Sequence, residues 1–140
     1  MPRHFLEDLT VGQAAEARRT VTADDIDRFA AVSGDHNPVH VDEAFAATTQ
    51  FKARIAHGML AGAFISALLG EELPGPGGIY ISQSLKFRRP IHIGDEVVTR
   101  VEITDIDARH GHVTAKTTCS VAGKAAVTGE AVMLVAKRPA

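Results

Sequence analysis

The stretch GMLAGAFISALLG, residues 58–70, is apolar on every side except at Ser66. A helix without a polar face is stable only where other parts of a protein cover it. The run PGPGG at residues 74–78 ends this segment, because proline and glycine cluster at breaks between elements. The segment is shorter than the roughly 20 residues that a membrane-spanning helix needs. We therefore predict one buried central helix.

The chain after this helix alternates apolar and polar residues with a period of two. Val97, Val101 and Ile103 are apolar, whereas Arg100 and Glu102 between them are charged. This period is typical of antiparallel strands in a sheet that has one covered face and one exposed face. The predicted strands are residues 79–87, 95–106, 112–121 and 125–136.

The first part of the chain predicts one more strand and two short helices. Residues 13–21 form a candidate strand, and Thr22 is suited to cap a helix over residues 23–33 that stops at Gly34. A second short helix is predicted over residues 43–47. Because the strands do not alternate with helices, a doubly wound α/β fold is excluded. We expect an α+β fold in which a curved antiparallel sheet wraps around the central helix.

Composition limits the classes of function. The 140 residues are expected to form one domain, residues 1–140, and the formal net charge of −2 gives no reason to expect a nucleic-acid or membrane partner. The single Cys119 excludes an internal disulfide and a cysteine-built zinc site. Residues 1–11 lack the apolar core of a signal peptide. The expected location is the cytoplasm.

A polar stretch, SGDHNPVH at residues 33–40, follows the first predicted helix. It holds a carboxylate at Asp35 and an imidazole at His40, five positions apart. Neither a helix nor a strand places such a pair on one face. Pro38 biases Asn37 toward extended backbone, and the resulting turn would permit the pair to share one water. The alternative is an ordinary polar turn in which Asp35 only accepts backbone amides.

Metal and serine chemistry have weaker support in the sequence. A zinc site needs about three ligands at regular spacing. The pair His36 and His40 has Pro38 between its members, which we expect to interrupt any helix. No HExxH or GxSxG motif is present. His110 and His112 flank a glycine and are expected at the surface. We therefore expect no metal centre and no nucleophilic serine.

The start of the central helix is a second candidate feature. The first amides of a helix have no intrahelical partner, and the helix dipole adds a partial positive charge there. Gly58 lacks a Cβ, so an atom of a ligand could approach its N–H closely. Such a position suits negative charge that develops on a carbonyl oxygen. The alternative is that Gly58 simply begins a helix in a crowded core.

Several motifs together resemble a known family. DHNPVH (35–40) is followed by AHGML (56–60) and YISQSLKFRRPIHIGDEV (80–97). This combination resembles the MaoC-like branch of the hot-dog fold, and within it the short single-domain (R)-specific enoyl-CoA hydratases. The resemblance covers nearly the whole chain, from FLEDLTVGQ (5–13) to TGEAVMLV (128–135).

The resemblance implies a reaction and a role for each matching residue. It implies reversible hydration of a trans-2-enoyl-CoA to an (R)-3-hydroxyacyl-CoA, with Asp35 and His40 as the catalytic pair. Asn37 would order their loop, the Gly58 N–H would bind the thioester oxygen, and Ser66 would be a polar helix position close to the pair. Coenzyme A arrives as part of the substrate, so no metal or redox cofactor is expected.

Two further expectations concern the acyl chain and the assembly. If Ser66 faces the catalytic pair, Leu69 lies on the same helix face, and Gly62 leaves room there. Leu69 is therefore a candidate wall of the acyl pocket, although it could equally be a core residue. Proteins of this fold usually pair edge to edge, so we expect a homodimer.

Rival functions share the fold. A thioesterase would release free thiol, and a dehydratase could act on an acyl-carrier-protein substrate or on a branched or dicarboxylic acyl-CoA. A non-catalytic acyl-CoA-binding protein would be expected to lack Asp35 or His40, and both are present. The sequence leaves the acyl length, the carrier and the pathway open.

Overall fold

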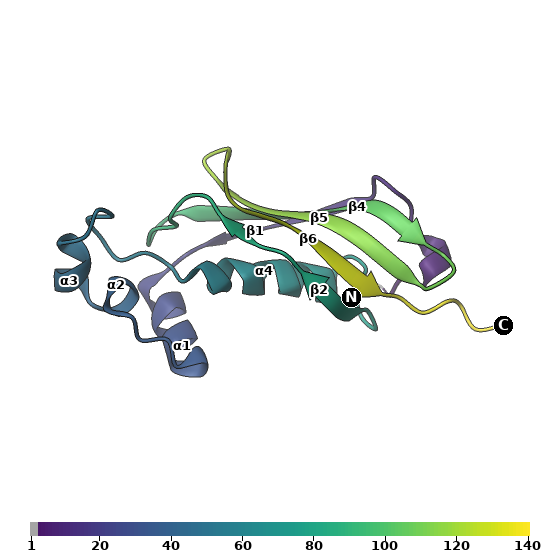
Figure 1. Cartoon of the computed structure of the whole chain (residues 1–140), viewed down its shortest axis with the longest axis horizontal. Helices are drawn as coiled ribbons and strands as arrows, with labels where there is room; N and C mark the ends of the chain where they lie inside the picture. Colours follow the sequence, from purple (N-terminus) through teal and green to yellow (C-terminus); the bar gives the residue numbers. More distant parts are fainter. Residues whose placement is uncertain (1–2) are drawn as a thin grey trace.

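The predicted central helix is present as α4 (Gly58–Glu71), and a curved antiparallel sheet lies across one side of it (Figure 1). The computed structural model describes residues 3–140. Among these residues, no helix is long and apolar enough to cross a membrane. The remaining elements are η1 (Leu6–Asp8), β1 (Ala14–Thr20), α1 (Ala23–Ser33), α2 (Pro38–Val41), α3 (Glu43–Ala47), β2 (Ile79–Gln83), β3 (Lys86–Phe87), β4 (Glu96–Asp107), β5 (His112–Val121) and β6 (Lys124–Leu134).

The sheet is antiparallel throughout and has the strand order β1-β4-β5-β6-β2, with β3 also paired to β6. The period-two pattern sets its register and its faces. Val101 of β4 lies opposite Thr117 of β5, and both side chains are fully buried, whereas the neighbouring Arg100 is partly exposed. The expected α+β arrangement, one helix and one curved antiparallel sheet, is confirmed.

The core lies between α4 and the inward face of the sheet. Ile65 of α4 is fully buried, as are Val97 and Cys119 on the sheet. Close approach is possible because Ala61 has a small side chain, and the Sγ atom of Cys119 lies 3.6 Å from the Ala61 carbonyl oxygen. Burial of such side chains contributes about 1.5–3 kcal/mol each to stability.

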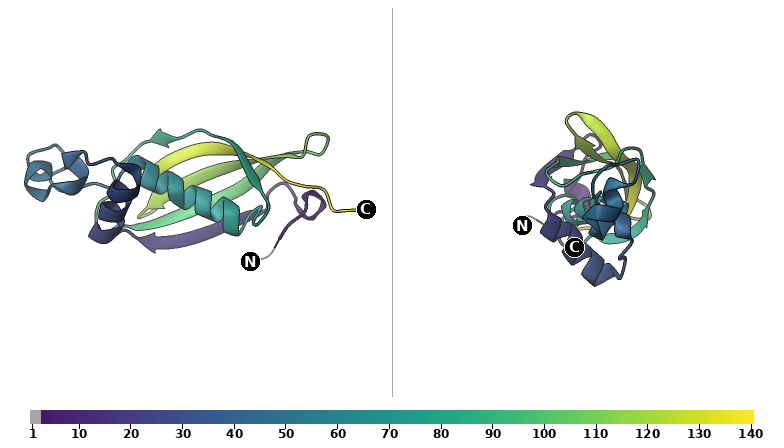
Figure 2. Two further views of the ribbon diagram at one scale, coloured as in Figure 1. Left: turned by 90° about the horizontal axis from the view of Figure 1, so that it is seen from below. Right: turned by 90° about the vertical axis from the view of Figure 1, so that its left-hand side faces the viewer.

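The outer side of α4 differs from the expectation of a helix buried all round. Met59 is 56% exposed, and Ala63 and Ala67 are also exposed. Figure 2 shows α4 across one face of the sheet, with α1 beside only one of its ends. A single copy of the chain provides a sheet for one side of the helix and no second layer for the other within the described residues.

Two local features differ from the sequence prediction. Residues 79–87 form two short strands, β2 and β3, separated by Ser84 and Leu85, and the Ser84 carbonyl oxygen lies where a Cβ on Gly129 would stand. Pro38 prevents a helix from running from His36 to His40, as expected, but it also begins a short helix, α2, that was not predicted, since the first helical position needs no N–H donor. The prediction for α1 is confirmed, and Gly34 ends it in the left-handed conformation at φ 80°.

Candidate active site

The predicted turn forms at the end of the molecule where α2 and α3 project from the sheet (Figure 1). The Asn37 N–H donates to Oδ1 of Asp35 over 3.1 Å, and the Asn37 side-chain oxygen accepts the Val39 N–H over 3.2 Å. The His40 N–H in turn donates to the Asn37 carbonyl over 2.9 Å. Asn37 thus caps α2 and holds the backbone between Asp35 and His40 in a turn.

This turn brings the predicted pair together. A carboxylate oxygen of Asp35 and a ring nitrogen from each of His40 and His57 all lie within 4.8 Å of one another. Asp35 is exposed, His40 is partly buried and His57 is 3% exposed. The sequence predicted the proximity of Asp35 and His40, but it gave no role to His57. Its only signal was its position beside Gly58.

Residues 54 and 55 fix the position of His40. The Nε of Arg54 donates to the His40 carbonyl over 2.6 Å, and a terminal nitrogen of Arg54 bridges to Asp27 of α1 at 2.6 Å. The His40 Nδ1 donates to the Ile55 carbonyl over 2.8 Å. Because a carbonyl oxygen only accepts, Nδ1 carries a proton, and in the neutral imidazole Nε2 of His40 has a free lone pair.

The three side chains meet the distance criterion for a metal site but have the wrong orientation. The rings of His40 and His57 are stacked, with centroids 4.0 Å apart and planes inclined by only 28°. The lone pairs of an imidazole lie in its plane, so two nearly parallel rings do not direct them at one ion, as a tetrahedral zinc site requires.

The start of α4 lies beside this pair and is open. His57 is the N-cap residue, and its side chain makes no capping hydrogen bond to the first amides within residues 3–140. A Cβ on Gly58 would stand 2.5 Å from the Phe87 ring, so the glycine is required by close packing as well. Here a cavity of about 460 Å³ opens. Its walls include His40, His57, Gly58, Met59, Phe87, Arg88 and Arg89.

A second cavity, of about 400 Å³, lies along the outer side of α4. It is lined by Phe29, Met59, Gly62, Ala63, Ser66, Tyr80, Gln83 and Leu85. Met59 lines both cavities, so the two meet at this side chain. Burial raises the pKa of Tyr80, and its phenol donates a hydrogen bond to the Gln83 side-chain oxygen. Ser66 lies in this second cavity and does not line the one at Gly58.

Leu69 lies elsewhere. Its side chain is 1% exposed and belongs to the hydrophobic core between α4 and the sheet. It does not line the cavity that holds Gly62 and Ser66. This position favours the alternative that Leu69 is a core residue, and its role as a pocket wall stays a prediction.

The fold and this arrangement of residues define a hot-dog protein of the dehydratase and hydratase type, as solved relatives show. Over 96% of the chain, the structure superimposes on the R-hydratase PhaJ1 of Pseudomonas aeruginosa with a TM-score of 0.91, 47% identity and 86% coverage of that chain. The (R)-hydratase of Aeromonas caviae gives a TM-score of 0.89 and 46% identity, with 95% and 99% coverage. The hot-dog expectation is confirmed.

The sequence comparisons give the family. Residues 8–125 match the model of the MaoC like domain, and the chain belongs to this family. It is 51% identical to the (R)-specific enoyl-CoA hydratase of Rhodospirillum rubrum, covering 96% of this chain and 94% of that protein. It is 42% identical to the 3-hydroxybutyryl-CoA dehydratase of Methylorubrum extorquens, with 96% and 85% coverage. The resemblance stated from the motifs is confirmed.

Proposed function

We propose that this protein is an (R)-specific enoyl-CoA hydratase, which adds water reversibly to a trans-2-enoyl-CoA and gives an (R)-3-hydroxyacyl-CoA. The observation that carries the proposal is that His40, with Asp35 close to it, lines the cavity that opens at the uncapped helix start at Gly58. The 51% identity to a relative that is named for this reaction supports it.

In the proposed mechanism, one water lies between the Asp35 carboxylate and Nε2 of His40. One of the two groups accepts a proton from the water as its oxygen bonds to C3 of the enoyl chain. The electrons of the C2–C3 double bond move toward the thioester, and a proton is delivered to C2 on the same face. Asp35 and His40 act as a coupled pair, so we assign the two proton transfers to the pair.

Gly58 would stabilise the charge that develops during addition. As the water oxygen bonds to C3, negative charge builds on the thioester oxygen. The Gly58 N–H and the positive end of the α4 dipole would face this oxygen. The stabilisation is stronger for the enolate-like transition state than for the neutral substrate, and this difference accelerates the reaction.

The two cavities suggest where the parts of the substrate lie. The cavity lined by Phe29, Met59 and Leu85 is suited to the acyl chain, because it follows α4 away from Gly58. The cavity at Gly58 includes Arg88 and Arg89, whose cations suit the phosphates of coenzyme A. Under this proposal the substrate supplies coenzyme A, and the reaction needs neither a metal nor a redox cofactor.

The decisive experiment follows the absorbance of the enoyl thioester with crotonyl-, hexenoyl- and longer enoyl-CoAs, together with the chirality of the product. We expect loss of the enoyl absorbance and formation of the (R)-alcohol. Release of free thiol at the same rate would instead identify a thioesterase. Binding without turnover would identify a non-catalytic acyl-CoA-binding protein. Crotonyl thioesters of coenzyme A and of acyl carrier protein, tested side by side, give the carrier preference.

We also propose a homodimer. The outer side of α4 carries the exposed Met59, and the edge strand β2 carries Ile79 and Ile81, which are 59% and 47% exposed. A second copy would cover these apolar side chains and the open strand edge. Light scattering at micromolar concentration should give twice the mass of the chain, and a fully active monomer would contradict the proposal. Ile81→Lys should weaken the dimer, whereas Val11→Lys, at an exposed turn, should not.

A further inference from the structure

We propose, on the basis of the function above, that His57 is a positioning residue that holds the Asp35–His40 pair in place relative to the start of α4. His57 is next to the proposed oxyanion donor in sequence, and it contacts both members of the pair. None of the chemistry proposed above uses its side chain.

The side chain of His57 connects the two members of the pair. Its Nε2 donates a hydrogen bond to the backbone carbonyl of Asp35 over 2.9 Å. Its ring stacks on that of His40 at 4.0 Å and is supported from Phe29 at 4.9 Å. The stack limits how far the His40 ring can tilt, and the hydrogen bond limits how far the Asp35 backbone can move away from α4.

The Asp35 turn has few other restraints. The remaining hydrogen bonds of Asp35 within residues 3–140 join it to Ser33 and Asn37, which are two positions away in the chain. These bonds shape the turn itself but do not fix its distance from α4. His40 differs, because Arg54 and Ile55 hold it independently of His57. Loss of the His57 hydrogen bond should therefore displace Asp35 more than His40.

The backbone of His57 sets the third component of the site. As the N-cap residue of α4 it has φ −57° and ψ 137°, and its carbonyl accepts the Leu60 N–H over 3.0 Å. The next amide is that of Gly58. One residue thus determines the direction of the proposed oxyanion donor through its backbone and the position of the Asp35–His40 pair through its side chain. Reaction rates are sensitive to displacements of about 1 Å in such arrangements.

The environment of the buried His57 ring indicates that this residue contributes a hydrogen bond and does not only fill space. The ring is 3% exposed, and its Nδ1 is buried without a hydrogen-bond partner in the described part of the chain. A carbonyl oxygen only accepts, so Nε2 carries a proton, and in the neutral imidazole Nδ1 has a bare lone pair. A phenyl ring would fill the same space without this unfavourable buried nitrogen. What the phenyl ring lacks is the N–H that binds Asp35.

Two substitutions separate the hydrogen bond from the ring. His57→Phe keeps the stack on His40 and removes the donor to Asp35, whereas His57→Gln keeps an amide donor and removes the ring. We expect His57→Phe to lower kcat for crotonyl-CoA by about 10- to 100-fold with KM changed by less than about twofold. His57→Gln should regain most of the lost kcat. Thr99→Val is the matched control, since Thr99 is 3% exposed and its side chain bonds, among residues 3–140, to Cys119, away from the site.

The same substitution in an Asp35→Asn background tests whether His57 acts through Asp35. We expect His57→Phe to add little to the effect of Asp35→Asn, because residues that act as one unit are not additive. An equal further loss in that background would overturn the positioning role and leave the proposed function intact. A kcat loss in His57→Phe that only follows its unfolded fraction, measured by thermal melting, would also overturn it. Full activity of Asp35→Asn alone would instead contradict the proposed function.

Discussion

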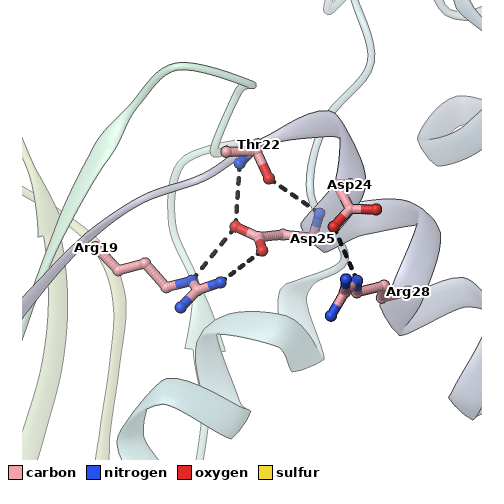
Figure 3. Close-up of polar contacts among 5 residues, drawn as sticks. All are labelled: Arg19, Thr22, Asp24, Asp25 and Arg28. Carbon is pink, nitrogen blue, oxygen red and sulfur yellow. Dashed lines mark hydrogen bonds and ion pairs between the residues drawn. The ribbon is translucent and has the colours of Figure 1, made fainter.

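The starts of α1 and α4 show two ways of treating the same chemical problem, the unpaired amides at the beginning of a helix. At α1 the Thr22 hydroxyl accepts the Asp25 N–H over 3.1 Å, and the Asp25 carboxylate accepts the Thr22 N–H over 3.1 Å (Figure 3). Arg19 binds both oxygens of the same carboxylate. At α4 the residues are His57 and Gly58, and no side chain of the described residues caps the helix.

The difference separates a helix start that serves stability from one that is available for chemistry. The first turn of α1 contains two aspartates, which offset the positive end of its dipole. The first turn of α4 contains no acidic residue, so that in the described chain its partial positive charge faces the cavity without compensation. A side-chain cap at the start of α4 would increase the stability of the fold. The uncapped start is therefore consistent with the proposed role of the Gly58 N–H as a donor to the thioester oxygen.

The largest effect on kcat is expected from substitution of Asp35 or His40, the pair beside the start of α4. Asp35→Asn and His40→Ala should each lower kcat by at least about 10²-fold, the low end of what general acid–base groups contribute. Both residues lie in a partly exposed turn, so the melting temperature should stay near that of the wild type. Steady-state kinetics with crotonyl-CoA and thermal melting test this. Turnover near the wild-type rate in either variant would remove that residue from the mechanism.

A second, smaller effect on kcat is expected when the start of α4 loses the Gly58 N–H. Gly58→Pro removes the N–H at the first helical position, where proline is tolerated, and His57 already has the extended ψ of 137° that a following proline requires. Gly58→Ala adds a Cβ against the Phe87 ring but keeps the N–H. We expect kcat of the proline variant to be about 10²-fold below that of the alanine variant, the usual cost of one oxyanion donor.

A glycine at the other end of the same helix provides the control for this comparison. A Cβ on Gly70 would meet no atom within 4 Å in the described structure. Gly70→Ala should therefore keep full activity and stabilise the fold by up to about 1 kcal/mol, because alanine favours a helix over glycine. Equal kcat values for Gly58→Pro and Gly58→Ala would show that the amide does not stabilise the transition state.

The sequence alone predicted the features that repeat along the chain. The apolar segment 58–70 and the period-two strands follow from local burial patterns, and both are present. The division of residues 79–87 into β2 and β3 depends on Gly129 across the sheet, so no local pattern contains it. The helix α2 was missed because proline was taken as a breaker rather than as a first residue.

The site was partly predictable for a different reason. Asp35 and His40 were found through a motif of neighbouring residues, although their convergence depends on a turn that spacing alone does not impose. The contact of His57 with Asp35 joins a side chain to a backbone carbonyl 22 positions away. Every residue has a backbone carbonyl, so the identity of the residues does not indicate such a contact. The hydrogen bond from His57 to Asp35 is recognised only in the three-dimensional structure.

The next prediction concerns chain-length preference and Leu69, which lies near the C-terminal end of α4. If Leu69 is a wall of the acyl pocket, Leu69→Ala should raise kcat/KM for longer enoyl-CoAs relative to crotonyl-CoA by about tenfold. Its position in the core predicts in addition a loss of about 2–5 kcal/mol in the free energy of unfolding. Denaturant unfolding and kcat/KM ratios across chain lengths test both. An unchanged ratio with a large loss of stability would place the acyl chain against Met59 and Leu85 instead.

The smallest effect is expected at the capped start of α1, and it should affect stability without affecting catalysis. The hydrogen bonds from Arg19 lower the pKa of Asp25 below its ordinary value of 3.8, and the side chain is only 10% exposed. Because the folded state lowers this pKa, the ionised carboxylate stabilises the fold above pH of about 4 and loses its effect as the pH falls through the lowered value. Asp25→Asn should cost about 1 kcal/mol at pH 7, and this difference should shrink below pH of about 4.

Asp24 provides the matched control, because it also begins α1 but lies in an exposed pair with Arg28 at 2.8 Å, where the two side chains are 69% and 81% exposed (Figure 3). Asp24→Asn should change the free energy of unfolding by less than about 0.5 kcal/mol, as exposed ion pairs contribute little. Both variants should keep the wild-type kcat, since the start of α1 binds no substrate in the proposed mechanism. A kcat loss in Asp25→Asn similar to that of Gly58→Pro would mean that the capped start also serves the reaction. The side-chain caps at the start of α1 would then not show that this helix start contributes to stability alone.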